Sequence, residues 1–150
     1  MQKQNNKNKT TEKKRNVGVY IDGENISAKK AKEIIRLAED KGVIDYTKVY
    51  ARQKDPYTRN WTTAAKNNHL KEIRIAGQPE KNKVDRKLQK DIVKDIQKSK
   101  NIDIVCIVSS DHGYAETASQ VRAMGKRVII IGESKAPDRL QKSGNEFVRI

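Results

Sequence analysis

The sequence is poor in the residues that staple small folds and in the apolar runs that enter membranes. It has one cysteine, Cys106, which excludes a disulfide framework and a zinc site built from thiolates. No apolar run approaches the roughly 20 residues that a transmembrane helix needs, and the first residues lack the apolar segment of a secretory signal. The sequence therefore predicts a cytoplasmic protein that does not use a membrane.

Acidic residues are also few compared with basic ones. The 150 residues include 33 Lys and Arg against 19 Asp and Glu, which gives a formal net charge of +14. Such an excess indicates a polyanionic partner, with nucleic acid the first candidate and an anionic membrane surface the second. The alternative is a basic protein without a special partner.

The first 16 residues differ in composition from the rest of the chain. They are rich in Lys, Asn, Gln and Thr and show no apolar periodicity. We expect residues 1–16 to be a disordered basic tail that adds sequence-independent affinity for phosphates, or has no specific role. Residues 17–150 are long enough for one domain with a real core.

Short apolar runs alternate with amphipathic segments along residues 17–150. The run from Val17 ends in Asp22-Gly23, which is typical of a buried parallel strand with a sharp exit. Further strands are expected at residues 46–51, 70–76, 103–108 and 127–131, with a last short strand left open at 147–150. Helices are expected at residues 26–40, 56–68, 83–99 and 115–124, with a short one around Leu140. This alternation predicts an α/β fold with a central parallel sheet of about five strands, flanked by helices.

Acidic residues occupy the ends of two of these strands. In a doubly wound sheet of order 3-2-1-4-5, the first and fourth strands are neighbours, and ligands bind at the edge formed by their carboxyl ends. Asp22 follows the first strand, and Asp111 follows the fourth after two serines. We expect these two side chains to lie about 5 to 10 Å apart, which is one or two strand spacings.

The helix expected at residues 83–99 begins at the same edge and carries acids on its apolar side. Asp85 lies in the opening turn and projects between Ile92 and Ile96. Asp91 lies on the same side, about 9 Å farther along the axis. Asp95 is deeper still, and there we expect a lysine partner. An unpaired buried charge is costly, so these acids need partners.

The predicted cluster of Asp22, Asp85 and Asp111 needs a cation. Three carboxylates within about 5 Å repel by roughly 3 kcal/mol per pair at an effective dielectric of 20. Oxygen ligands favour Mg²⁺ or Mn²⁺ over zinc, and such an ion activates water for attack on a phosphodiester. Asp22 and Asp111 each have a simpler interpretation, as a turn former and a helix cap. Their convergence with Asp85 favours the metal site.

Three nearby residues have both a functional and a structural interpretation. Asn25 can orient water or phosphate, or cap the helix that follows. His112 can shuttle a proton or have no chemical role. Trp61 lies among basic residues, as in grooves that stack single-stranded bases, but we favour its packing against the sheet.

Three motifs follow one another after the tail. They are YIDGEN at residues 20–25, NKVDRKLQKDIV at 82–93 and IVSSDHGYA at 107–115, and MGKRVIIIG at 124–132 fits the next unit. Together they resemble the NYN domain, in the LabA-like branch of the PIN-like nuclease superfamily. The resemblance implies a single PIN-like domain over residues 17–150 and a ribonuclease that uses clustered aspartates with Mg²⁺ or Mn²⁺.

The resemblance carries over residue by residue. The positions that match the family's acidic and amide residues are Asp22, Asn25, Asp85, Asp91 and Asp111. The serine-rich motif often has a second aspartate two residues after the first, where this chain has Gly113. This departure weakens a second metal position and leaves a first metal site intact.

The leading hypothesis is a metal-dependent endoribonuclease that cleaves RNA. The expected catalytic residues are the metal ligands Asp22, Asp85 and Asp111, supported by Asp91, Asn25 and Ser109. The residues expected to steer the RNA backbone are Arg52, Lys54, Arg59, Lys81, Lys83, Arg86 and Lys87. The alternative is an RNA-binding or adaptor module of the same fold with little or no catalysis. The RNA substrate and the oligomeric state, a homodimer included, stay open.

Other phosphate-handling folds lack their signatures here. No G-x-G-x-x-G follows the first strand, so the sequence gives no support for a dinucleotide site. The segment from Asp22 to Glu24 lacks the D-x-D of aspartyl phosphatases. The third strand is followed by Gly77 rather than by the acceptor aspartate of a receiver domain.

Overall fold

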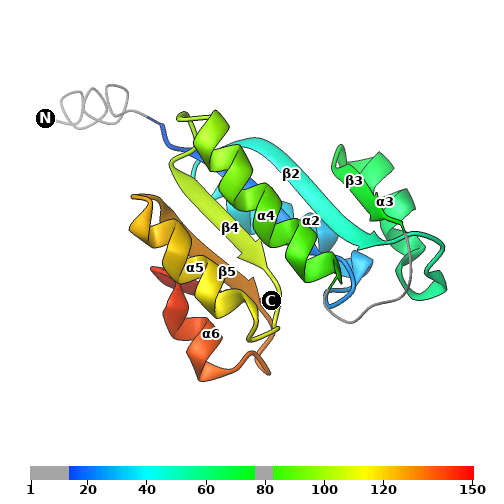
Figure 1. The fold of residues 1–150 in the computed structure, drawn as a ribbon. Helices are drawn as coiled ribbons and strands as arrows, with labels where there is room; N and C mark the ends of the chain where they lie inside the picture. Colours follow the sequence, from blue (N-terminus) through cyan, green and yellow to red (C-terminus); the bar gives the residue numbers. More distant parts are fainter. Residues whose placement is uncertain (1–13, 77–82) are drawn as a thin grey trace, which may run out of the picture.

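Six parallel strands form the centre of the protein. The computed structural model describes residues 14–76 and 83–150 (Figure 1). The strands are β1 (Asn16–Asp22), β2 (Val43–Arg52), β3 (Lys71–Ile75), β4 (Ile104–Val108), β5 (Arg127–Gly132) and β6 (Glu146–Arg149). Their spatial order is β3-β2-β1-β4-β5-β6, and each neighbouring pair is parallel. The α/β fold and the adjacent first and fourth strands are confirmed, and β6 adds a sixth strand at one edge.

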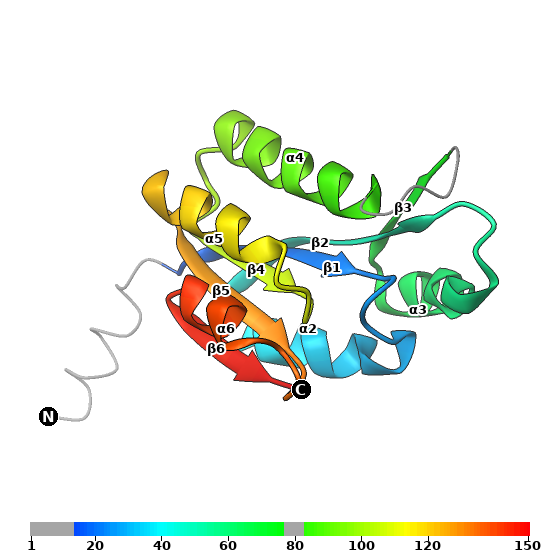
Figure 2. The same cartoon turned by 60° about the horizontal axis from the view of Figure 1, so that its bottom comes forward.

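Helices cover both faces of this sheet. They are η1 (Ala28–Lys30), α2 (Ala31–Glu39), η2 (Pro56–Thr58), α3 (Asn60–Asn68), α4 (Lys83–Lys98), α5 (Tyr114–Ala123) and α6 (Asp138–Ser143). Figure 2 shows α4, α5 and α6 on one face, and α2 and α3 on the other. None of these helices is long and apolar enough to cross a membrane.

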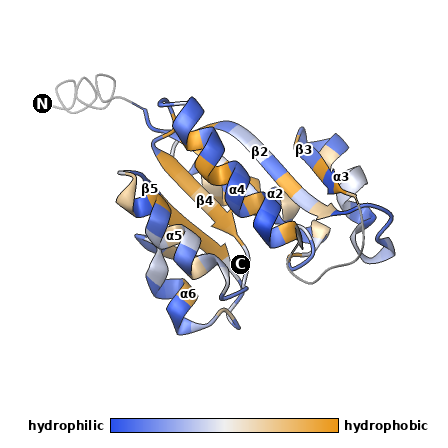
Figure 3. Ribbon diagram, viewed as in Figure 1, coloured by the Kyte–Doolittle hydropathy of each residue, from blue (hydrophilic) through white to orange (hydrophobic). Residues whose placement is uncertain are grey.

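The central strands are apolar because both of their faces are covered. Figure 3 shows β4 and β5 as apolar strands between helices with polar outer sides. Along β4, Val105 and Ile107 face the α4–α5 side, whereas Cys106 and Val108 face the α2–α3 side. Each buried side removes apolar surface from water, which drives the folding of the unit. Cys106 is fully buried and serves as a small core residue, as expected.

Several element boundaries differ from the sequence expectation. The tail was expected to end at residue 16, but β1 already begins at Asn16, and residues 1–13 lie outside the described part. The segment expected as one helix at 26–40 is the 3-10 turn η1 followed by α2. Ser27 caps this turn by accepting a hydrogen bond from the Lys29 backbone N–H at 3.3 Å. Asn25 is therefore not the helix cap.

The segment at residues 56–68 is a 3-10 turn followed by α3, with Trp61 in the core. Its side chain is 1 % exposed, and its Nε1–H donates to the Ile26 carbonyl at 2.9 Å. The packing interpretation of Trp61 is confirmed, and its burial excludes it as a stacking platform for bases.

Polar side chains between α4 and the sheet form a paired network. The Tyr20 hydroxyl donates to Asp95 at 2.8 Å, and the Lys48 ammonium lies 2.6 Å from the same carboxylate. Tyr46 bonds in turn to the Tyr20 hydroxyl. The lysine partner expected for Asp95 is thus confirmed, and the network fixes α4 over β1 and β2.

Gly23 allows the turn after β1 to pass close to β2, which leads to a stability prediction. A Cβ atom at Gly23 would lie 2.8 Å from the Tyr50 carbonyl oxygen and 3.0 Å from a Val49 methyl. We expect Gly23→Ala to lower the free energy of unfolding by about 1–3 kcal/mol, because the backbone must move. Urea unfolding measures the difference.

Gly113→Ala is the matched control. Its Cβ would meet nothing closer than 3.5 Å, and its φ of −59° suits any residue. We expect no loss of stability for this variant. If both variants unfold at the same urea concentration, the close approach at Gly23 does not constrain the fold.

Candidate metal centre

Three carboxylates meet at the carboxyl edge of the sheet. Asp22 ends β1, Asp85 lies in the first turn of α4, and Asp111 follows β4. One oxygen atom from each of them lies within 4.8 Å of the others. Asp22 is 2 % exposed, whereas Asp85 and Asp111 are half-buried. The structure therefore brings together the three acids that the sequence analysis grouped.

The donor set and its spacing fit a hard divalent cation. Two oxygens bound to the same Mg²⁺ lie at most about 4.2 Å apart, because each Mg–O distance is about 2.1 Å. The three carboxylate oxygens are close enough to share one ion, either directly or through the water ligands that Mg²⁺ keeps. Among the side chains that the structure describes, no lysine or arginine forms an ion pair with these acids. A bound cation would supply the missing positive charge.

Two of the three carboxylates are also held by a local hydrogen bond. The backbone N–H of Glu24 donates to Asp22 at 3.2 Å, and that of Gly113 donates to Asp111 at 3.0 Å. The turn-forming interpretation of Asp22 therefore holds beside the metal interpretation. The Asp111 carboxylate stabilises the turn that it begins. It is not the cap of α5, because the residue at the cap position is Gly113, and no side-chain hydrogen bond caps this helix.

Asn25 and Ser109 tie the two turns together. The Asn25 Oδ1 accepts a hydrogen bond from the Ser110 backbone N–H at 2.7 Å. The Ser109 hydroxyl lies 3.2 Å from Asp22 Oδ2 and accepts from the Asp111 backbone N–H at 3.1 Å. Because Ser109 is fully buried, we assign it to holding the carboxylate of Asp22 in place. Both residues fix the end of β1 against the end of β4.

The electrostatics of the cluster disfavour three negative charges. Burial, followed by the charge of Asp85, raises the pKa of Asp22 from 3.8 to about 7. Burial also raises the pKa of Asp85, with the charge of Asp111 adding to the rise and the hydrogen bond from Tyr114 opposing it. A cation reverses this balance, because it favours the ionised carboxylates.

Two residues of the site were missed at the level of sequence. Tyr114, fully buried at the start of α5, donates its hydroxyl hydrogen bond to Asp85 at 3.0 Å. Glu24 adds negative charge near Asp85 and is held by the backbone N–H and Nε of Arg52, at 3.0 and 2.8 Å. The only signal was position, since Tyr114 and Glu24 both lie within the motifs. Apart from its place in the motif, Tyr114 would be interpreted as an ordinary core residue, because it lies on the buried face of a helix.

Asp91 does not join the cluster. It accepts a hydrogen bond from the Tyr50 hydroxyl at 2.7 Å and pairs with Lys87 at 3.0 Å. These contacts anchor α4 to β2, and any support that Asp91 gives to the three carboxylates passes through the placement of α4. His112 is exposed in the loop after β4, with its Nδ1 3.4 Å from Asp111.

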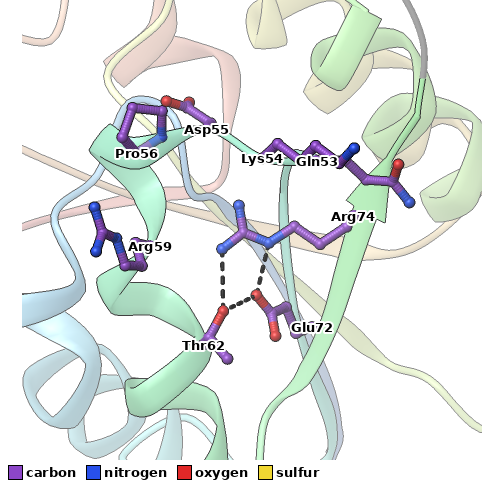
Figure 4. A pocket seen from close by; sticks show the side chains of 8 residues that line it. All are labelled: Gln53, Lys54, Asp55, Pro56, Arg59, Thr62, Glu72 and Arg74. Atoms are coloured by element: carbon purple, nitrogen blue, oxygen red, sulfur yellow. Dashed lines mark hydrogen bonds and ion pairs between the residues drawn. The ribbon is translucent and has the colours of Figure 1, made fainter.

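The basic residues expected to bind nucleic acid are spread over several surfaces. Lys54 and Arg59 line a pocket of about 570 Å³ beside η2, together with Arg74 (Figure 4). Arg86 lines another of about 430 Å³ between α4 and α5. Arg52 pairs with Glu24 and Asp55, and Lys87 with Asp91. Lys81 lies outside the described residues, and Lys83 begins α4.

These observations define a class of protein and then a family. A doubly wound sheet with acids gathered at its carboxyl edge defines an α/β protein that binds its ligand where the strands end. Residues 16–150 match the family model of the NYN domain. The chain therefore belongs to the NYN domain family, within the PIN-like nuclease superfamily.

A solved structure shows the same fold. It is the crystal structure of a protein of unknown function from Vibrio parahaemolyticus, with a TM-score of 0.74 and 17 % sequence identity. The alignment covers 91 % of this chain and 93 % of that one. At this identity the likeness concerns the fold alone. No curated protein matches the chain.

The raised pKa of Asp22 predicts how stability depends on pH in EDTA. Between about pH 4 and 7 the folded protein keeps a proton on Asp22 that the unfolded chain has lost, so stability falls as pH rises. Asp22→Asn has no such proton. We expect the variant to be more stable than the wild type at pH 8, by on the order of 4 kcal/mol, and equally stable near pH 4.

Urea unfolding at both pH values, with and without Mn²⁺, measures this effect. Mn²⁺ at pH 8 should stabilise the wild type and leave Asp22→Asn unchanged. Parallel stability curves for the two proteins from pH 4 to 8 would show that Asp22 does not ionise against its surroundings.

Proposed function

We propose that the protein is a metal-dependent endoribonuclease whose Asp22, Asp85 and Asp111 hold Mg²⁺ or Mn²⁺. The observation that carries this proposal is the convergence of three carboxylates, with no lysine or arginine partner among the described side chains, in an NYN domain. The bound ion would polarise a phosphoryl oxygen of RNA and activate water for in-line attack. A cytoplasmic location stays a prediction of the sequence.

The residues of the chain position the ligands before any substrate binds. Ser109 and the Glu24 N–H hold Asp22, and Tyr114 holds Asp85. Preorganised ligands need little rearrangement when charge develops in the transition state. Because Asp22 is buried and the Asp111 side chain is 32 % exposed, a phosphodiester approaches from the Asp111 side of the cluster.

Positive charge supports RNA as the substrate. The net charge of +14 favours a polyanion, and its attraction to phosphates weakens as salt increases. Lys54 and Arg59 form no ion pair among the described residues, so they are free to contact phosphates. They line the pocket beside η2, with Lys54 on the loop that follows β2 and Arg59 between η2 and α3.

Gly113 favours a second candidate function. A Cβ atom there would lie 3.5 Å from an Asp111 oxygen and 3.9 Å from an Asp85 oxygen, so the chain lacks a side chain that would face the cluster. With only three carboxylates, the domain could bind RNA and cleave it weakly or not at all. Metal-dependent cleavage separates the two candidates.

Removing a metal ligand tests the nuclease proposal. We expect Asp22→Asn and Asp111→Asn each to reduce Mn²⁺-dependent cleavage of a mixed RNA substrate by more than about 100-fold, because each loses a charged ligand. The measurement is the initial cleavage rate on denaturing gels. Asp40→Asn, an exposed acid after α2, is the matched control and should keep the wild-type rate.

Cleavage that persists in EDTA, or that is equal in the wild type and Asp22→Asn, would refute the nuclease proposal. Salt-sensitive RNA binding without cleavage by the wild type would instead favour the binding module.

Restoring a fourth carboxylate tests whether Gly113 limits the centre. We expect Gly113→Asp to lower the Mn²⁺ concentration for half-maximal thermal stabilisation, by at least about fivefold, because ligand charge sets affinity. In EDTA at pH 8 the same variant should be less stable than the wild type, through repulsion from Asp85 and Asp111.

Gly113→Asn is the control, since it has the same shape without the charge and should show neither effect. Identical Mn²⁺ dependence in Gly113→Asp and Gly113→Asn would show that position 113 does not face the metal.

A further inference from the structure

A pocket of about 430 Å³ lies beside the metal centre, between the turn after β1 and the start of α3. Its lining includes Asn25, Ser27, Arg52, Asp55, Tyr57 and Asn60. We propose that this pocket binds one unpaired base of the RNA, stacked on Tyr57, next to the phosphodiester that the carboxylates cleave. This inference rests on the proposed function and adds a preference for single-stranded RNA.

Tyr57 is exposed to a degree that the fold does not explain. Its side chain is 94 % exposed, whereas Val43, the other exposed large apolar residue in the described part, is 46 % exposed. No aromatic ring or cation among the described residues lies over the Tyr57 ring. A base stacked on an aromatic side chain contributes about 1–3 kcal/mol of binding free energy, whatever its identity. Tyr57 is therefore available as a stacking surface.

The turn that presents Tyr57 is held from both sides. The Asp55 carboxylate caps η2 by accepting from the Tyr57 backbone N–H at 3.0 Å. Arg74 on β3 donates to the Thr58 hydroxyl at 2.7 Å and to its carbonyl at 2.8 Å. Figure 4 shows Arg74 turned toward α3 and braced by Glu72, which lies 2.6 Å from its Nε. A ring on a fixed turn loses little entropy when a base stacks on it.

The pocket walls suit a neutral base better than a phosphate. Arg52 is the one basic residue of the lining, and its guanidinium already pairs with Glu24 and with Asp55. It is therefore not free to bind a phosphate. Asn25 and Asn60 bring neutral amide groups to the pocket. Neither amide nitrogen makes a hydrogen bond to another residue of the described part. Asparagine amides can read the edge of a base through paired hydrogen bonds.

The pocket and the metal centre share one turn. Asn25 lines the pocket, and its Oδ1 accepts from the Ser110 N–H, next to Asp111. Glu24 also lines the pocket, and its backbone N–H donates to the carboxylate of Asp22 at 3.2 Å. A base held here therefore belongs to a nucleotide close to the cleaved bond. On the far side of η2, Lys54 and Arg59 can meet the phosphates that continue the strand.

RNA binding without metal tests the pocket separately from cleavage. The probes are a fluorescent eight-nucleotide single-stranded RNA of mixed sequence and its blunt duplex, in EDTA, read by fluorescence anisotropy. We expect Tyr57→Ala to weaken single-strand binding by about 5- to 100-fold and to change duplex binding by less than about twofold, because paired bases cannot stack on the ring. Tyr57→Phe, which keeps the ring, should restore single-strand binding. His69→Ala, an exposed ring at the other end of α3, is the off-site control.

Each outcome bears on the pocket or on the proposed function. Single-strand binding by Tyr57→Ala that equals the wild type, or a loss that is equal for both probes, overturns the pocket and leaves the nuclease proposal intact. A wild type that shows the Tyr57 effect but does not cleave with Mn²⁺ supports the pocket and refutes the nuclease proposal. A wild type that binds neither RNA in EDTA overturns the pocket, and the nuclease proposal is then decided by cleavage with Mn²⁺.

Discussion

Repulsion among three carboxylates is the constraint on which the rest of the site depends. Asp22, Asp85 and Asp111 come from three separate elements, yet they offer oxygens within 4.8 Å of one another. Burial makes the repulsion stronger, since charge is screened less away from water. The fold keeps the acids together through hydrogen bonds from Ser109 and Tyr114. This arrangement is one that a divalent cation stabilises. Without a cation, burial and the charge of Asp85 raise the pKa of Asp22 to about 7, which favours its protonated form.

The order of the strands makes this convergence possible. Because β1 and β4 are parallel neighbours, the turns that follow them lie side by side, and α4 begins at the same edge. Asn25 and Ser109 then join the two turns. The same turn after β1 forms one wall of the pocket below Tyr57. The proposed metal centre and the proposed base pocket therefore share one segment of three residues, 23–25.

Periodicity and topology account for what could be predicted from the sequence. Apolar runs predicted the strands, and the four-residue repeat of α4 placed Asp85 on the inner side near Asp22. The roles of Asn25 and Tyr114 could not be predicted, because they depend on how loops and helices pack rather than on a repeat. The burial of Trp61 was the favoured interpretation and is confirmed. The exposure of Tyr57 was not predicted, because it depends on how the short 3-10 turn η2 lies on the surface. The sequence did not decide whether the edge strand β6 forms, because a segment of only four residues gives a weak pattern.

The central claim is that the three acids form one metal site. It is tested most directly by counting bound Mn²⁺ at pH 8 through the electron paramagnetic resonance signal of the free ion, in the wild type and in Asp85→Asn. The account predicts saturable binding by the wild type that is strongly weakened in Asp85→Asn, although this acid lies more than 60 residues from Asp22 in the sequence. Equal Mn²⁺ binding by the two proteins would contradict it.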